Sequence, residues 1–129
     1  MITVSNKFPI NYLIYMIQTA LPLPEQAIQA FCDRWQVTKL ALFGSILRDG
    51  FRPDSDIDIL VTFASESNWS LIDHATMQQE PASLLNRAVD LVSKRAIERS
   101  HNWIRRQEIL TTAQVIYAQE LRSLTAGNL

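Results

Sequence analysis

The chain has 129 residues, of which 47% are hydrophobic and 19% are charged, a composition typical of one globular domain. Five prolines and three glycines argue against disorder and low-complexity repeats. A formal net charge of −1 argues against a protein that binds nucleic acid by phosphate neutralisation alone. The single cysteine, Cys32, excludes an internal disulfide, and with only His74 and His101 far away in sequence it excludes a structural zinc site.

Residues 1–23 are interpreted as an N-terminal extension and residues 24–129 as one domain. The most apolar part of the extension, Ile10–Ala20, is too short to span a bilayer of about 30 Å. No signal-peptide cleavage site follows it cleanly, so we expect a cytoplasmic protein that does not contact membranes. Because the stretch is apolar almost all round, it should either cover the sheet or dock on another chain.

The first predicted elements are a helix and two strands. A helix begins near Pro24 and places Ile28, Cys32 and Trp35 on one apolar face, so Cys32 is interpreted as a buried hydrophobic residue. Strands are predicted over Val37–Phe43 and Asp56–Phe63, separated by a turn-forming segment.

The second half of the chain continues the alternation of helices and strands. A helix, a strand, a helix and a short strand are predicted over residues 69–87, 88–93, 101–112 and 114–117. We expect the first of these helices to be broken or bent near Pro81, and the second to turn Ile104, Ile109 and Leu110 inward. This order predicts a small α+β or α/β domain with a sheet covered by helices.

Gly44 and Ser45 follow the first strand directly. Without a Cβ, Gly44 lets a phosphate approach the main chain, and Ser45 can cap a short helix whose free N–H groups attract an anion. Arg48, one helical turn later, can add a cation to a phosphate. The simpler alternatives are an ordinary strand-to-helix turn and a solvated surface arginine.

Asp56 and Asp58 lie two residues apart at the start of the second strand. Side chains alternate along a strand, so these carboxylates share one face, with Cα atoms roughly 6.6 Å apart, while Ile57, Ile59 and Val61 face the core. Paired carboxylates repel each other and suit Mg²⁺, which shares its coordination with water and phosphates. The alternative is an exposed strand rim, with Asp56 capping the turn.

Asp90 is the lone charge in the apolar strand Ala88–Ser93. If this strand pairs beside the Asp56 strand, Asp90 joins the other two acids as a metal ligand or as the base for an incoming hydroxyl. The alternative is a salt bridge to Arg87 or Arg95.

These residues carry a family resemblance. Gly44-Ser45, ten further residues and Asp56-Ile57-Asp58 resemble the signature of the polymerase-β-type nucleotidyltransferases. Residues 42–61, together with 102–110 and 115–117, resemble the small MNT-type (minimal nucleotidyltransferase) antitoxins, whose partners are HEPN-domain toxins. The resemblance covers roughly residues 25–120 and departs at Leu47, where many members carry alanine. It implies the minimal nucleotidyltransferase fold, a small mixed sheet flanked by helices.

The resemblance also implies a reaction. Gly44 and Ser45 would hold the triphosphate of ATP, and Asp56, Asp58 and Asp90 would bind magnesium as an acidic triad, with two ions suited to in-line displacement. The expected activity is transfer of AMP to a hydroxyl of a cognate HEPN toxin. We expect this hydroxyl to belong to a tyrosine, and the two proteins to form a hetero-oligomer. A binding-only antitoxin and an adenylyltransferase acting on a small molecule are the alternatives. A basic group is expected to steer an acidic partner surface to the same cleft: Lys94, Arg95, Arg99, Arg105 and Arg106.

Overall fold

The computed structural model describes residues 25–48, 52 and 54–119, so the predicted N-terminal extension with its apolar stretch lies outside the described residues. The order of elements is α3 (Glu25–Trp35), β1 (Val37–Phe43), η1 (Gly44–Leu47), β2 (Ile57–Phe63), α4 (Leu71–Leu85), β3 (Val89–Ser93), α5 (Lys94–Glu98), α6 (Trp103–Thr112) and β4 (Gln114–Ala118). The predicted strands and longer helices are confirmed, with bounds that differ by a few residues. None of the helices in these ranges is long and apolar enough to cross a membrane.

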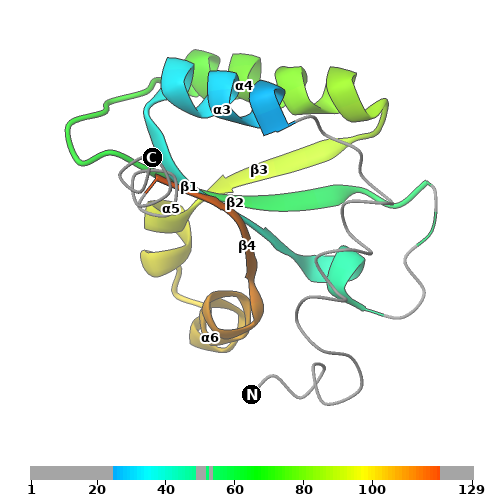
Figure 1. Cartoon of the computed structure of the whole chain (residues 1–129). Coiled ribbons are helices and arrows are strands. Elements are labelled where there is room, and N and C mark those ends of the chain that lie inside the picture. Colours follow the sequence, from blue (N-terminus) through cyan, green and yellow to red (C-terminus); the bar gives the residue numbers. More distant parts are fainter. Residues whose placement is uncertain (1–24, 49–51, 53, 120–129) are drawn as a thin grey trace, which may run out of the picture.

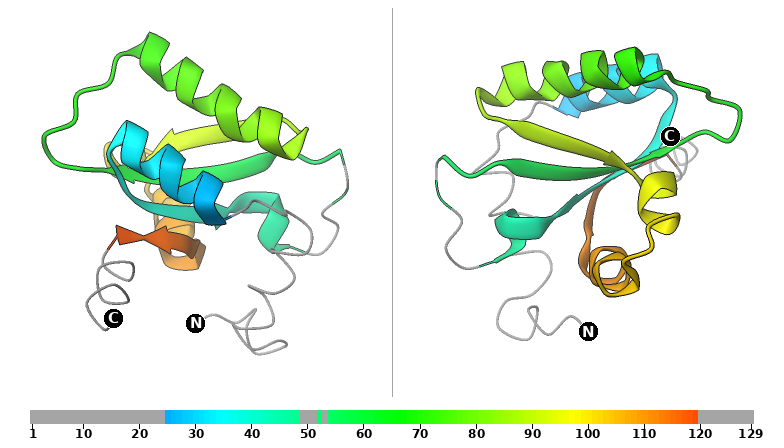
Figure 2. Two further views of the ribbon diagram at one scale, coloured as in Figure 1. Left: turned by 45° about the horizontal axis from the view of Figure 1, so that its top comes forward. Right: turned by 180° about the vertical axis from the view of Figure 1, so that it is seen from behind.

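The four strands form one mixed sheet in the order β3-β2-β1-β4. β1 runs antiparallel to both β2 and β4, whereas β2 and β3 are parallel. Helices α3 and α4 lie on one face of this sheet, and α5 and α6 lie on the other (Figures 1 and 2). The predicted sheet flanked by helices is therefore confirmed.

The main core lies between the sheet and the pair α3 and α4. Ile57, Ile59 and Val61 of β2 are 0%, 3% and 0% exposed, which confirms the predicted alternation along this strand. Cys32 is 1% exposed within the same cluster, as expected for a small buried hydrophobic residue.

A second, smaller core on the opposite face was not predicted. It joins residues of β1, β2, α5 and α6: Ala41, Phe43, Leu60, Ile97 and Ile109. The prediction that Ile104 and Leu110 point inward is wrong, because they are 64% and 38% exposed. At 100° per residue, Ile104 lies about 140° and Leu110 about 100° around the helix from the buried Ile109, so a single inward residue anchors α6.

Helix α4 runs through Pro81 without a break, so of the predicted break or bend the break is wrong. Pro81 is buried, and the packing of its ring offsets the backbone hydrogen bond that proline cannot donate. The helix begins with a reciprocal capping box between Ser70 and Asp73 and ends at Asn86, whose φ of 54° is left-handed.

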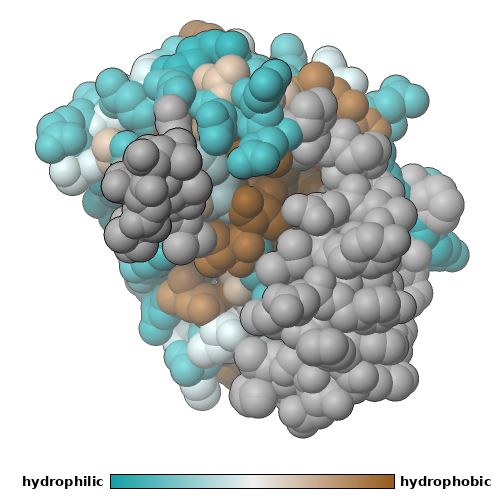
Figure 3. All heavy atoms as spheres, viewed as in Figure 1, coloured by the Kyte–Doolittle hydropathy of each residue, from teal (hydrophilic) through white to brown (hydrophobic). Residues whose placement is uncertain are grey.

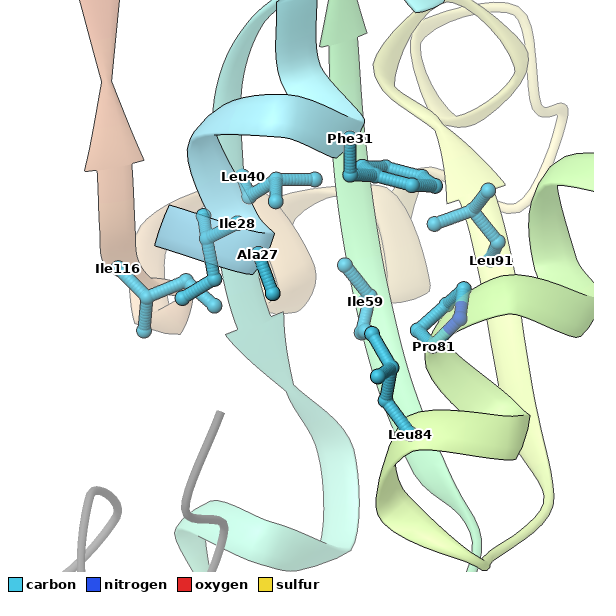
Figure 4. A pocket seen from close by; sticks show the side chains of 9 residues that line it. All are labelled: Ala27, Ile28, Phe31, Leu40, Ile59, Pro81, Leu84, Leu91 and Ile116. Carbon is cyan, nitrogen blue, oxygen red and sulfur yellow. The ribbon is translucent and has the colours of Figure 1, made fainter. Parts of the chain in front are cut away.

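An apolar groove crosses the main-core face between α3, α4 and β4 (Figure 4). Ile28, Leu84 and Ile116 are among its lining residues, and Leu84 is 51% exposed. Apolar side chains are visible in the middle of this side of the molecule in Figure 3.

Two side chains of α4 form hydrogen bonds with the backbone at the outer edge of β3. His74 Nε2 lies 2.6 Å from the carbonyl oxygen of Leu91, and the N–H of Leu91 donates to Oε1 of Gln78 at 2.9 Å. The backbone N–H and C=O of Leu91, in the middle of this strand edge, are thereby paired with side chains of α4. His74 thus packs the fold, whereas His101 is exposed.

Candidate functional site

Gly44 stands against Asp58 at the point where β1 ends. Phe43, the last residue of β1, pairs with Asp58 of β2, and Gly44 has a φ of +77°. A Cβ at position 44 would lie 2.2 Å from Oδ2 of Asp58, far inside van der Waals contact. Both the left-handed backbone and the close approach of a carboxylate therefore require glycine here.

Ser45 lies within η1 and does not cap it. The residue at the capping position is Phe43, which makes no side-chain cap hydrogen bond, so the predicted capping role of Ser45 is wrong. The reason is that η1 begins at Gly44, directly at the strand end, which leaves no turn residue ahead of Ser45. Ser45 stays half-buried beside Gly44, and its carbonyl accepts the N–H of Arg48 at 3.0 Å.

The parallel pairing of β2 and β3 places Asp58 directly beside Asp90, on neighbouring strands about 4.8 Å apart. This confirms that the strand of Asp90 pairs beside the strand of Asp58. β2 begins at Ile57, so Asp56 directly precedes the strand and does not open it as predicted. Asp58 is half-buried, and Asp56 and Asp90 are exposed.

The electrostatics of Asp58 show that several charges meet at this place. Burial raises the pKa of Asp58 above its ordinary value, and the negative charges of Asp90 and Asp56 raise it further. The positive charges of Arg105 and Arg48 oppose this rise. Three acids and two arginines therefore act on one site.

The two arginines that were the alternative partners of Asp90 differ in their contacts. Arg87 donates to the carbonyl oxygen of Arg52 at 2.6 Å, and within the described ranges no ion pair joins Asp90 to Arg95. The group on which the negative charge of Asp90 acts is the carboxylate of Asp58, whose pKa it raises.

Arg48 and Arg105 approach the acids from η1 and α6. Arg48 lies 3.9 Å from Glu108 of α6, in a pair whose side chains are more than half exposed, so the ion pair adds little stability but places α6 next to η1. Sequence reasoning assigned Arg105 only to a steering group. Its position one turn before the inward Ile109 is the signal that connects it with the sheet.

The donor set of this site is made of carboxylate oxygens, which suit a hard cation such as Mg²⁺. Among the residues that the structure describes, no three Asp, Glu, His or Cys side chains form a ready-made metal site. Mg²⁺ commonly takes one or two carboxylates and fills its other positions with waters and substrate phosphates. Asp58 and Asp90, side by side on neighbouring strands, fit that mode.

The fold and this site define a nucleotidyltransferase domain. The family model described as "Nucleotidyltransferase domain" matches residues 24–116, and the chain belongs to this family. The match includes all six predicted site residues: Gly44, Ser45, Arg48, Asp56, Asp58 and Asp90.

Similar proteins support the same assignment. The protein adenylyltransferase MntA of Thermococcus cleftensis is 36% identical over 66 residues, which are 51% of this chain and 65% of that protein. A crystal structure of a toxin–antitoxin with AMP-PNP is similar over 82% of this chain and 83% of that chain, with 27% identity and a TM-score of 0.58. A structure of a minimal nucleotidyltransferase covers 78% of this chain and 92% of that one, with 29% identity and a TM-score of 0.55. These similarities confirm the expected minimal nucleotidyltransferase fold.

Proposed function

We propose that this protein is the antitoxin of a toxin–antitoxin pair and transfers AMP from ATP to a hydroxyl of a HEPN-domain toxin. The observation that carries the proposal is the contact between the bare backbone of Gly44 and the carboxylate of Asp58, with Asp90 in register beside it. This arrangement brings the backbone at the end of β1 and a pair of acids to one point. The similar proteins named above, an adenylyltransferase and a toxin–antitoxin with AMP-PNP, support it.

In the proposed reaction, the acceptor oxygen attacks the α-phosphorus of ATP. The bond between this phosphorus and the bridging oxygen breaks, pyrophosphate leaves, and the acceptor's proton passes to Asp90, an exposed acid beside Asp58. Gly44 and Ser45 hold the phosphates, and Arg48 contributes positive charge. Mg²⁺ would be held by Asp56, Asp58 and Asp90, and we propose two ions. These ions would stabilise the charge on the attacking and leaving oxygens.

The acceptor is proposed to be a tyrosine of the toxin, reached within a hetero-oligomer. Five basic residues on α5, α6 and the loop between them, against two acids in the same stretch, make this side of a net-acidic chain positive. Complementary charge would steer an acidic surface of the partner towards it. The basic residues are Lys94, Arg95, Arg99, Arg105 and Arg106, and the acids are Glu98 and Glu108.

The test is incubation of the purified protein with the HEPN-domain protein encoded beside it, ATP and Mg²⁺, followed by intact-mass analysis. We expect the toxin, and not this chain, to gain the mass of AMP units. Asp58→Asn and Asp56→Asn should abolish the gain, while Asp54→Asn, an exposed turn residue in the same segment, should preserve it. A stable complex without any added nucleotide would instead support a binding-only antitoxin, and the absence of both complex and transfer would refute the proposal.

Metal dependence has a separate readout in the melting temperature. A ligand that binds only the folded state stabilises it by about 2.7 kcal/mol at one hundred times its dissociation constant. We expect ATP with Mg²⁺ to raise the melting temperature by much more than ATP with a chelator does. Equal shifts under both conditions would contradict binding through the carboxylates.

A further inference from the structure

Helix α6 is capped at its first turn and packs against the sheet through Ile109. Ile109 is 5% exposed in the second core, in the same cluster as Phe43 and Leu60. The side chain of Asn102 accepts the N–H of Arg105 at 3.1 Å, and Nη1 of Arg106 donates to the carbonyl oxygen of Ser100 at 2.7 Å. The backbone that carries Arg105 is therefore fixed at both its cap and its core contact.

Arg105 lies on the side of α6 that faces the candidate site. It precedes Glu108 by three residues and Ile109 by four, and residues at these spacings share a helix face. Glu108 contacts Arg48 just after η1, and Ile109 packs in the cluster that contains Phe43, the strand partner of Asp58. The side of α6 that carries Arg105 is thus next to η1 through Glu108, and next to the strand pair of Phe43 and Asp58 through Ile109.

The guanidinium of Arg105 is available to a ligand. Its side chain is exposed, and in the described part of the chain it makes no ion pair. The neighbouring Arg106 differs, because its guanidinium is engaged by the carbonyl of Ser100. The positive charge of Arg105 is one of the two that oppose the rise in the pKa of Asp58.

We propose that Arg105 contacts the phosphate chain of the nucleotide from α6, opposite the Gly44-Ser45 backbone, so that the phosphates lie between the two. The inference rests on the proposed function only in taking a nucleoside triphosphate as the ligand. A triphosphate brought to three carboxylates needs positive charge on its other side, and the planar fork of arginine matches phosphate oxygens with two parallel hydrogen bonds. Arg105 is then a binding residue, and its role goes beyond steering a protein partner.

The test compares Arg105→Gln and Arg105→Lys with the wild type in the full chain. The measurements are the dissociation constant of MgATP, the inhibition constant of magnesium tripolyphosphate as a competitor, and the melting temperature without ligand. A lost charge-assisted hydrogen bond corresponds to about tenfold or more in affinity. We expect Arg105→Gln to weaken MgATP and tripolyphosphate by the same factor, with an unchanged melting temperature, and Arg105→Lys to recover part of the affinity.

Arg95→Gln is the matched control, because Arg95 is an exposed arginine on α5 within the same basic side. It should leave both constants within about twofold of the wild type. The inference is overturned if Arg105→Gln binds MgATP as the wild type does, or if it weakens MgATP without weakening tripolyphosphate. Because these are binding measurements, a wild type that binds MgATP but transfers no AMP would refute the proposed reaction and leave the role of Arg105 standing.

Discussion

Gly44→Ala should disturb the fold and the site through two separable effects. The first is backbone strain, since an L-residue at a φ of +77° costs about 1–2 kcal/mol. The second is a collision, because the new Cβ would lie 2.2 Å from Oδ2 and 3.1 Å from Cγ of Asp58. Relieving such an overlap typically costs about 1–3 kcal/mol. We therefore expect a total loss of about 2–5 kcal/mol in the free energy of unfolding, measured by denaturant or thermal unfolding.

A double-mutant cycle separates the two effects. Asp58→Ala removes the colliding oxygen and Cγ and leaves only Cβ, which is 3.4 Å away and in ordinary contact. In that background Gly44→Ala should cost only the strain, so the coupling free energy should be about 1–3 kcal/mol. Asp58→Asn keeps the shape and removes the charge, so in this second background Gly44→Ala should cost as much as in the wild type. Equal costs of Gly44→Ala in all three backgrounds would refute the close approach of the two residues.

Three further predictions address charge, packing and capping. Because the pKa of Asp58 is raised in the folded chain, the folded state binds this proton more tightly than the unfolded state does, and that contribution is lost as pH rises through the folded pKa. Asp58→Asn should therefore be more stable than the wild type at pH 7, with a gain that shrinks below the ordinary carboxyl pKa. Unfolding experiments at a series of pH values can measure this gain. Ile109→Ala should cost about 2–4 kcal/mol of unfolding free energy and weaken MgATP through the displacement of α6, which calorimetry can detect. Ser70→Ala should cost about 1 kcal/mol through loss of the α4 cap and leave MgATP binding unchanged; a change in binding would contradict a purely structural cap.

The main-core face of the sheet was predictable because its pattern is local. Ile57, Ile59 and Val61 alternate with less apolar neighbours, and this period of two is read directly from the sequence. Leu60 belongs to the opposite face and is 6% exposed. Its partner Ile97 lies in a five-residue helix, α5, which is too short to show a helical period. The second core was therefore missed.

Gly44, Asp56 and Asp58 could be singled out from the sequence for a similar reason, since they lie within one strand–loop–strand unit. The spacing of Arg105 from Ile109 places both residues on one side of α6, but α6 covers the second face of the sheet through the packing of Ile109. Which acids that side of the helix approaches depends on tertiary packing between distant elements, so the sequence alone did not connect Arg105 with Asp58.

The second face of β2 explains how the acids come to differ in environment. Alternate residues along this side pass from Leu60, which is 6% exposed, to the half-buried Asp58 and then to the exposed Asp56. The same side of the sheet that carries a small core under α5 and α6 thus turns polar where those helices stop covering it. The carboxylate nearest the core meets the greatest desolvation, which is the largest cause of its raised pKa. The boundary between core and solvent is therefore what distinguishes Asp58 from the two exposed acids, Asp56 and Asp90.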